Sequence, residues 1–130
     1  MVFFYYRLVQ HKVAIIVYSS LEGDGKSANF RALNTAEELL SAGDDVALVY
    51  DGSGTKALGA MLDRNHDFHK WFTRAEPALR HASGGACKLC AKSYKTLETI
   101  DNAGVELLEG FKGHASLRAL LNEGRQIITF

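Results

Sequence analysis

The chain has 130 residues, the length of a single domain. Its 15 Lys and Arg residues balance its 15 Asp and Glu residues, so it lacks the excess positive charge with which proteins hold nucleic acids or anionic membranes. No apolar run approaches the roughly 20 residues of a membrane-spanning helix. The apolar start has neither the basic lead nor the small-residue cleavage site of a signal peptide. We therefore expect a cytoplasmic protein with no nucleic-acid and no membrane partner.

The first half of the chain predicts a β-α-β unit. Residues 12–18 and 45–51 are continuously apolar and rich in β-branched side chains, as in strands that are buried on both faces. Between them, Ala and Leu recur at helical spacing over residues 27–43. A crossover of this kind joins parallel strands. Residues 1–11, rich in Phe and Tyr, predict an N-terminal apolar arm or extra strand, and residues 12–130 predict one domain.

The rest of the chain continues the alternation of helices and strands. Pro77 is expected to break or kink one of the helices. The expected helices are 56–62, 67–81, 90–102 and 116–123; the expected strands are a short one ending near Cys87, a short or merely extended segment at 105–108, and a closing strand at 126–130. This order predicts an α/β fold of three layers, with a mostly parallel sheet of about five strands between the helices.

Binding sites in such folds form beyond the carboxyl ends of the strands. Three loops are expected there, at 19–26, 51–55 and 85–90. Residues 23–27 resemble the tail of a phosphate-binding loop, but Ser20 stands where that pattern has Gly, so a plain loop that caps a helix is favoured. The first two loops offer six residues as candidates for holding a ligand: Ser19, Ser20, Gly25, Asp51, Gly52 and Ser53.

Both cysteines lie in the third loop, as Cys87-Lys88-Leu89-Cys90. Cys87 is expected between a strand and a helix N-terminus, where amide donors stabilise a thiolate and where Lys88 and Lys92 add positive charge. The glycine pair just before it argues against deep burial. Such a thiolate suits sulfur or disulfide exchange, and the alternative is a buried apolar cysteine. Cys90, one helical turn later, is either a resolving thiol or a helix-packing residue.

Two other chemistries of a Cys-x-x-Cys pair fit this chain less well. A thioredoxin-type motif opens the first helix after an early strand and faces a cis-proline, whereas Pro77, the single proline, lies upstream in a helical pattern. A zinc knuckle needs further ligands, and the available histidines do not match the spacing of a second pair. Those histidines are His66, His69, His81 and His114. We therefore expect no bound metal and no cofactor.

The order of three segments resembles the DsrE family (DsrE/DsrF, TusD and the YchN-like group). The first strand and Ala-rich helix, closed by residues 42–46 (Ala-Gly-Asp-Asp-Val), are similar to the family's first unit. The Cys-Lys-Leu-Cys motif at 87–90 resembles that of the YchN-like branch, and residues 117–130 resemble the closing helix and strand. The resemblance implies a DsrE-like domain that assembles into trimers or hexamers and carries sulfur as a persulfide, on the position of Cys87. The family motif usually continues with Ala-Arg-Gly, where this chain has Ser-Tyr-Lys at 93–95, a difference that concerns substrate or partner preference.

The sequence thus predicts a sulfur-relay protein or sulfurtransferase that carries sulfane sulfur on Cys87, with Cys90 as an optional resolving thiol. Its partners would be sulfur donor and acceptor proteins or small persulfides. Two alternatives stay open. One is a non-catalytic module that binds an anionic small molecule or mediates assembly, and the other is a reversible dithiol switch between the two cysteines.

Overall fold

The computed structural model describes residues 9–130 of the chain. The arm or extra strand expected over residues 1–11 therefore falls mostly outside the described residues. Residues 9–11 have no regular secondary structure. The side-chain amide of Gln10 donates to the carbonyl oxygen of Gly43 at 3.1 Å, and the amide of His11 donates to Asp44 Oδ1 at 2.8 Å. This segment thus lies against the turn that leads into the second strand.

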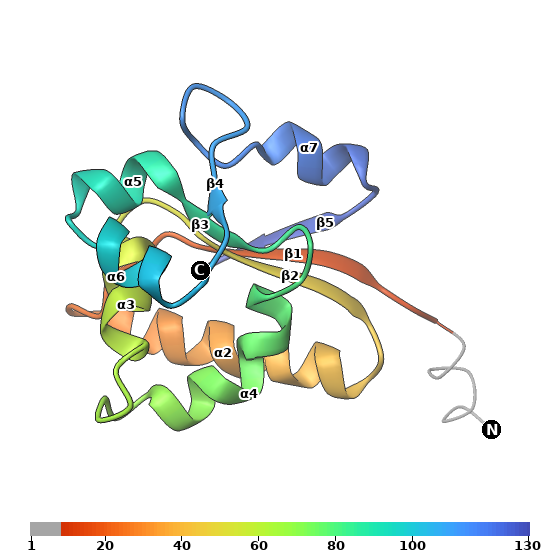
Figure 1. Ribbon diagram of the computed structural model, residues 1–130. Coiled ribbons are helices and arrows are strands. Elements are labelled where there is room, and N and C mark those ends of the chain that lie inside the picture. The colour runs from red at the N-terminus through yellow and green to blue at the C-terminus, as the bar shows by residue number, and fades with distance from the viewer. Residues whose placement is uncertain (1–8) are drawn as a thin grey trace.

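Five parallel strands form a single sheet in the order β4-β3-β2-β1-β5 (Figure 1). The strands Lys12–Val17 and Asp45–Tyr50 pair over their whole length, and their continuous apolar runs are buried on both faces. We call them the two central strands. The strands are β1 (Lys12–Val17), β2 (Asp45–Tyr50), β3 (Gly85–Cys87), β4 (Leu107–Leu108) and β5 (Gln126–Thr129). The predicted α/β fold with a parallel sheet of five strands is confirmed.

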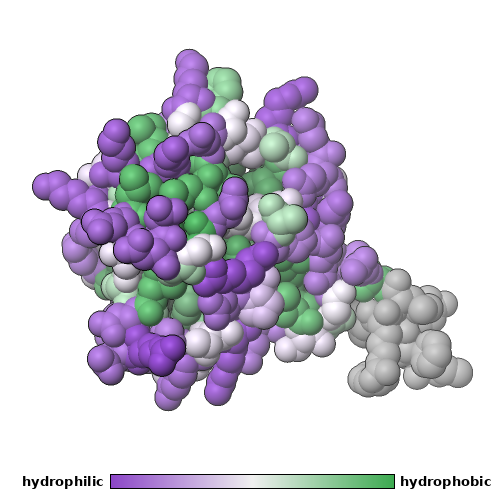
Figure 2. Space-filling model, in the orientation of Figure 1, coloured by the Kyte–Doolittle hydropathy of each residue, from purple (hydrophilic) through white to green (hydrophobic). Residues whose placement is uncertain are grey.

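Helices flank the sheet on both faces, which gives the expected three layers (Figure 1). They are α2 (Gly25–Ser41), α3 (Gly54–Met61), α4 (His69–Leu79), α5 (Lys88–Ser93), α6 (Leu97–Asn102) and α7 (Leu117–Asn122). No helix within residues 9–130 has both the length and the apolar character to cross a membrane. Hydrophilic side chains cover most of the face seen in Figure 2, with hydrophobic residues in smaller areas between them.

The two faces of the sheet carry cores of different size. Helices α2 and α4 pack on one face, where the core includes Ile15 and Leu48 from the sheet and Phe72 from α4. The opposite face holds a smaller cluster of buried residues, to which Cys87 belongs. Its other members are Ala14, Ile16, Val49, Ala115 and Leu120. Cys87 therefore lies under the thinner of the two covering layers, which α7 and the segment before it supply.

The single helix predicted over 90–102 is wrong, because the chain forms α5 and α6 there. A Schellman motif ends α5: Lys95 adopts a left-handed conformation with φ of 61°, and its amide donates to the carbonyl of Lys92 at 3.1 Å. The next amide, of Thr96, donates to the carbonyl of Ala91 at 2.8 Å. In a Schellman motif the residue with the left-handed conformation is usually a glycine, whereas here it is Lys95.

Helix α4 runs through Pro77 and ends at Leu79, so of the predicted break or kink the break does not occur. Proline removes one backbone donor and crowds the preceding turn. Pro77 lies close to the end of α4, and the buried Ala75, Ala78 and Leu79 hold both sides of it in the core. Packing therefore outweighs the local preference of this residue.

The glycine pair Gly84-Gly85 does not keep Cys87 from deep burial, contrary to prediction. Both glycines are buried, as is Cys87. A Cβ atom on Gly84 would lie 2.6 Å from the carbonyl oxygen of Ala78, and one on Gly85 would lie 2.4 Å from that of Glu106. The pair therefore allows backbone segments to approach closely, which is a second role of glycine besides exposure.

We expect Gly85→Ala to lower the free energy of unfolding by about 2 kcal/mol more than Gly124→Ala does. Both glycines have positive φ angles, of 143° and 80°, so both substitutions strain the backbone. Only Gly85 also meets a clash, because nothing lies within 4 Å of a Cβ placed on Gly124. Urea unfolding of the two variants measures the difference, and equal losses would contradict the close-approach explanation.

Arg125 anchors the amino ends of the two central strands and is 5% exposed. Its Nη1 donates to the carbonyl oxygens of Val13 at 3.1 Å and Asp45 at 3.2 Å. Its Nη2 lies 3.0 Å from Asp45 Oδ1, and its Nε lies 2.7 Å from Glu123 Oε1. His81 Nε2 also lies 2.8 Å from Asp45 Oδ1. This polar network joins β1, β2 and the segment that leads into β5, at the end of the sheet opposite the cysteines.

Because of this network, the free energy of unfolding of the protein should depend on pH in the acid range. Burial alone would raise the pKa of Asp45, but Arg125 and His81 outweigh it and lower that pKa. Hydrogen bonds from Arg125 and Ser83 lower the pKa of Glu123 against the effect of burial. The stabilisation is therefore complete above the unfolded-state pKa of about 4 and is lost as the pH falls through the lowered folded-state values.

Between about pH 5 and pH 3, the free energy of unfolding of the wild-type protein should fall more steeply than that of Glu123→Gln. Glutamine keeps the size of the side chain and has no charge to lose. Urea unfolding at several pH values gives both curves. Parallel curves would mean that Glu123 contributes nothing to the acid dependence.

Candidate functional site

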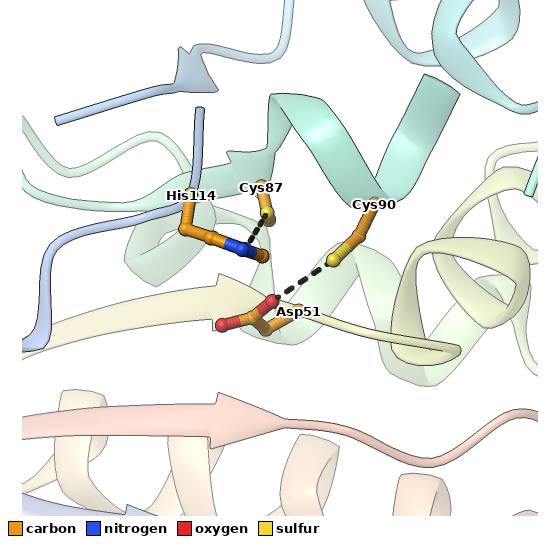
Figure 3. A group of neighbouring side chains, drawn as sticks. All are labelled: Asp51, Cys87, Cys90 and His114. Atoms are coloured by element: carbon orange, nitrogen blue, oxygen red, sulfur yellow. Dashed lines mark hydrogen bonds between the residues drawn. The ribbon is translucent and has the colours of Figure 1, made fainter. Parts of the chain in front are cut away.

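Four side chains with reactive or metal-binding atoms converge at the carboxyl edge of the sheet (Figure 3). Their ligand atoms all lie within 4.8 Å of one another. We call this group the thiol cluster; its members are Asp51, Cys87, Cys90 and His114.

The topology of the sheet explains how residues distant in sequence meet. Asp51 directly follows β2, and Cys87 ends the neighbouring parallel strand β3. Cys90 lies in the first turn of α5, on the side that faces Asp51 (Figure 3). His114 comes from the connection between β4 and α7, which a pair of backbone hydrogen bonds between Phe111 and His114 closes at 3.1 and 2.8 Å.

The sulfur of Cys87 contacts the imidazole of His114. The distance from Cys87 Sγ to His114 Nδ1 is 3.7 Å, and the carbonyl oxygen of Gly113 lies 4.0 Å from the same sulfur. Cys87 is fully buried, whereas His114 is exposed. The cysteine thus has an ionisable partner that reaches solvent, and its own access to solvent is closed.

Cys90 has a different environment from Cys87. It is half-buried, and its thiol donates to Asp51 Oδ1 at 3.4 Å. The amide of Gly52 also donates to Asp51 Oδ1, at 2.7 Å, and so orients the carboxylate. Burial, with further contributions from Cys87 and Asp51, raises the pKa of the Cys90 thiol well above its ordinary value. Cys90 is therefore a protonated thiol at neutral pH.

A groove of about 480 Å³ opens beside the thiol cluster. Its walls are mostly apolar and include Phe111 and Leu117, with Arg118 as a positive group. Asp51 and His114 line it directly. The groove thus gives a small molecule a path to two members of the cluster.

Both lysines predicted to stabilise a thiolate are exposed, and Lys88 is engaged by a carboxylate. Lys88 Nζ forms an ion pair with Glu109 Oε2 at 2.7 Å, and this contact raises the pKa of the exposed lysine. Lys92 is also exposed. The group that the structure brings to Cys87 is the imidazole of His114 instead.

Among the loop residues predicted to hold a ligand, Asp51 alone belongs to the thiol cluster. The carbonyl oxygens of Ser19 and Ser20 accept hydrogen bonds from Asn29 Nδ2 at 2.8 and 3.2 Å. The hydroxyl of Ser53 donates to the carbonyl oxygen of Tyr18 at 2.8 Å.

The two glycines among the predicted ligand residues are required by the backbone conformation of these loops. A Cβ on Gly25 would lie 1.9 Å from the carbonyl oxygen of Ser20, and Gly52 has a φ of 53°. The backbone carbonyls of Ser19 and Ser20, the hydroxyl of Ser53 and the two glycines thus help to fix the conformation of these loops.

The sequence does not identify two residues at this site, His114 and Tyr18. By its spacing, His114 is a candidate zinc ligand without a matching partner. Tyr18 lies close enough to the cluster that burial, together with Asp51 and both thiols, raises its pKa. Its position directly after β1, next to β2, was the signal that could have identified it.

Comparison with known proteins adds one relative. No family model matches the chain, and no solved structure matches it. The chain is 25% identical over 119 residues to "Uncharacterized protein MJ0733" of Methanocaldococcus jannaschii, a match that covers 90% of this chain and 93% of that protein. The identity does not assign the chain to a family, and the resemblance to DsrE proteins stays a prediction.

Proposed function

We propose that the protein is a sulfur carrier that holds sulfane sulfur as a persulfide on Cys87. The observation that supports this most strongly is the contact of Cys87 Sγ with His114 Nδ1 at 3.7 Å. A thiol reacts as its thiolate, and an imidazole beside it can take the proton as attack begins. The surroundings of Cys90 raise its pKa and so disfavour its thiolate.

Loading is an exchange of sulfur between two thiols. The thiolate of Cys87 attacks the outer sulfur of a donor persulfide, the donor S–S bond breaks, and the donor leaves as a thiolate. His114 receives the proton of Cys87 and returns it to the departing thiolate. The products are a persulfide on Cys87 and the donor thiol, so the step needs neither an oxidant nor a reductant.

Because Cys87 is buried, loading requires the connection at residues 110–114 to move away from the sulfur. This connection covers Cys87 with Gly113 and His114. Lys112 and Gly113 both have positive φ angles, of 51° and 84°, typical of a tight turn. The donor would enter along the groove beside His114.

Release can follow two routes. An acceptor thiol takes the outer sulfur of the persulfide directly, or Cys90 attacks the inner sulfur on Cys87. The second route forms a Cys87–Cys90 disulfide and releases hydrogen sulfide, after which a cellular thiol reduces the disulfide. The sulfur atoms lie within 4.8 Å of each other in the reduced protein, which supports this route.

We propose the reducing cytoplasm as the site of this chemistry, with small persulfides or persulfide-bearing proteins as donors and thiol-bearing proteins as acceptors. The exposed side chains of Phe111 and Leu117 beside the groove support docking of a protein partner. The trimer or hexamer that the resemblance implies stays a prediction.

The test is to incubate the reduced protein with a persulfide donor and to measure its intact mass. Wild type and Cys90→Ser should gain the mass of one sulfur atom, and Cys87→Ser should not. Serine keeps the size of each cysteine and removes the nucleophile. If Cys87→Ser gains sulfur as readily as wild type, the proposal is wrong.

A second candidate function is a reversible dithiol switch. The closeness of the two free sulfur atoms favours it. Equilibration of the protein with thiol buffers of graded potential would reveal the disulfide by blocking and weighing the remaining thiols. A switch requires a disulfide within the range of cellular thiol potentials, and a chain that stays reduced throughout would exclude it.

A further inference from the structure

We propose that the thiol cluster is a binding site for one zinc ion. This inference does not rest on the proposed sulfur chemistry, because zinc binding needs only the four ligand atoms and their arrangement. Each of the four residues offers one atom, and every pair of these atoms lies within 4.8 Å.

Two of the six separations between the ligand atoms match the edges of a zinc coordination tetrahedron. With Zn–S bonds of about 2.3 Å and Zn–N or Zn–O bonds of about 2.0–2.2 Å, a sulfur ligand lies about 3.6 Å from a nitrogen or oxygen ligand. Here Cys87 Sγ lies 3.7 Å from His114 Nδ1, and Cys90 Sγ lies 3.4 Å from Asp51 Oδ1. The other pairs lie within 4.8 Å, so the four side chains are close enough to converge on one ion.

The types of ligand atom indicate which metal ion the site would prefer. Two thiolates and an imidazole favour zinc over the hard cations Mg²⁺ and Ca²⁺, which prefer oxygen ligands. The carboxylate of Asp51 completes the set. Cys87 and Cys90 have the two-residue spacing that is common among zinc ligands, while the other two ligands come from different elements.

Binding of zinc leaves the charge of the cluster unchanged. With both thiols protonated, the imidazole neutral and the carboxylate ionised, the cluster carries one negative charge. Zinc replaces the two thiol protons, which leave to solvent, and the cluster again carries one negative charge. The two hydrogen bonds that now link the cluster are replaced by bonds to the ion. The exchange thus adds no net charge to a largely buried site.

The surroundings of the cluster suit a metal site in two further ways. The amide of Gly52 donates to Asp51 Oδ1 at 2.7 Å, the kind of outer contact that orients a carboxylate ligand. The groove reaches Asp51 and His114 from solvent and gives the ion an entry path. Because zinc and sulfane sulfur would both use Cys87, the zinc-bound protein should not take up sulfur.

The experiment uses the full chain, reduced and freed of metal with a chelator, and titrates it with Zn²⁺ in competition with a chromophoric chelator. Wild type should bind one zinc ion, and His114→Ala should bind it at least about 100-fold more weakly. His11→Ala is the matched control, because His11 is exposed and lies outside the cluster. Equal affinity of wild type and His114→Ala, or no binding by wild type, would overturn the proposal.

A measurement on wild type alone covers the case in which a variant fails to fold. Titration with Co²⁺ should give the sulfur-to-cobalt charge-transfer absorption and the intense visible bands of a tetrahedral thiolate site. A spectrum without sulfur-to-cobalt absorption would contradict the proposal. Neither readout uses a persulfide, so a failure of zinc binding is distinguishable from a failure of the proposed sulfur uptake.

Discussion

Replacing His114 with glutamine should slow the alkylation of Cys87 on the order of 100-fold, measured in a Cys90→Ser background so that one thiol remains. The imidazole lies 3.7 Å from Cys87 Sγ and can take its proton, whereas an amide cannot do so at neutral pH. Glutamine has a similar length, so the covering of the buried thiol changes little.

The control for this prediction is His11→Gln, which changes a histidine that lies outside the cluster. Its alkylation rate should equal that of the Cys90→Ser parent. In urea all three chains should react at the same rate, because the folded contact is then absent. A folded His114→Gln variant that reacts as fast as its parent would contradict activation by His114. A Cys87 thiol whose pKa, read from the pH dependence of its alkylation, is that of a free cysteine or higher would favour the non-catalytic binding module.

Arg125→Met should lower the free energy of unfolding by about 3 kcal/mol. The guanidinium pairs with Asp45 and Glu123 and donates to the carbonyl oxygens of Val13 and Asp45. Methionine fills part of the space but leaves these acceptors without their donor. Both carboxylates are about one-third exposed, which keeps the loss near the lower end of the range for broken buried pairs.

Arg74→Met is the matched control, because Arg74 is exposed on α4. It should change the free energy of unfolding by no more than about 0.5 kcal/mol. Urea unfolding of the two variants separates the buried network from a general effect of losing an arginine. Similar small losses in both would show that the network at the amino ends of the strands contributes little.

The fold was predictable because its central strands carry unambiguous patterns. The runs that became β1 and β2 are apolar without interruption, and a helix of regular spacing lies between them. Strand β3 has three residues and was expected only from the alternation of elements. The errors arose where tertiary packing or an unusual residue decided the outcome, as at Pro77 and Lys95.

The sequence predicts where in the fold the site lies, but not all of the residues that form it. The cysteine motif and Asp51 both follow strands, so their convergence at one edge of the sheet follows from a parallel topology. His114 follows β4 by several residues, and no spacing rule connects it to Cys87. Lys88, which lies between the cysteines in sequence, is paired with Glu109, and the ionisable group in contact with Cys87 is His114. Proximity in sequence therefore does not identify this contact.

The fold brings together potential zinc ligands that spacing along the chain does not identify. Spacing rules compare ligands along the chain, and by them the histidines did not form a second pair with the cysteines. The structure brings an imidazole and a carboxylate to the cysteines from two other connections. A cluster of this kind can hold a metal ion or present a reactive thiol, and the two states exclude each other at Cys87.

The position of the sulfur on the wild-type chain tests the central proposal most directly. Lys88 lies between the two cysteines, so trypsin places Cys87 in the peptide 81–88 and Cys90 in the peptide 89–92. The reduced protein is loaded with a persulfide donor, alkylated and digested, and the peptides are weighed. The proposal predicts the alkylated persulfide on the peptide with Cys87. Sulfur found on the peptide with Cys90 instead, or on neither peptide while both cysteines are recovered as free thiols rather than as a Cys87–Cys90 disulfide, would contradict it.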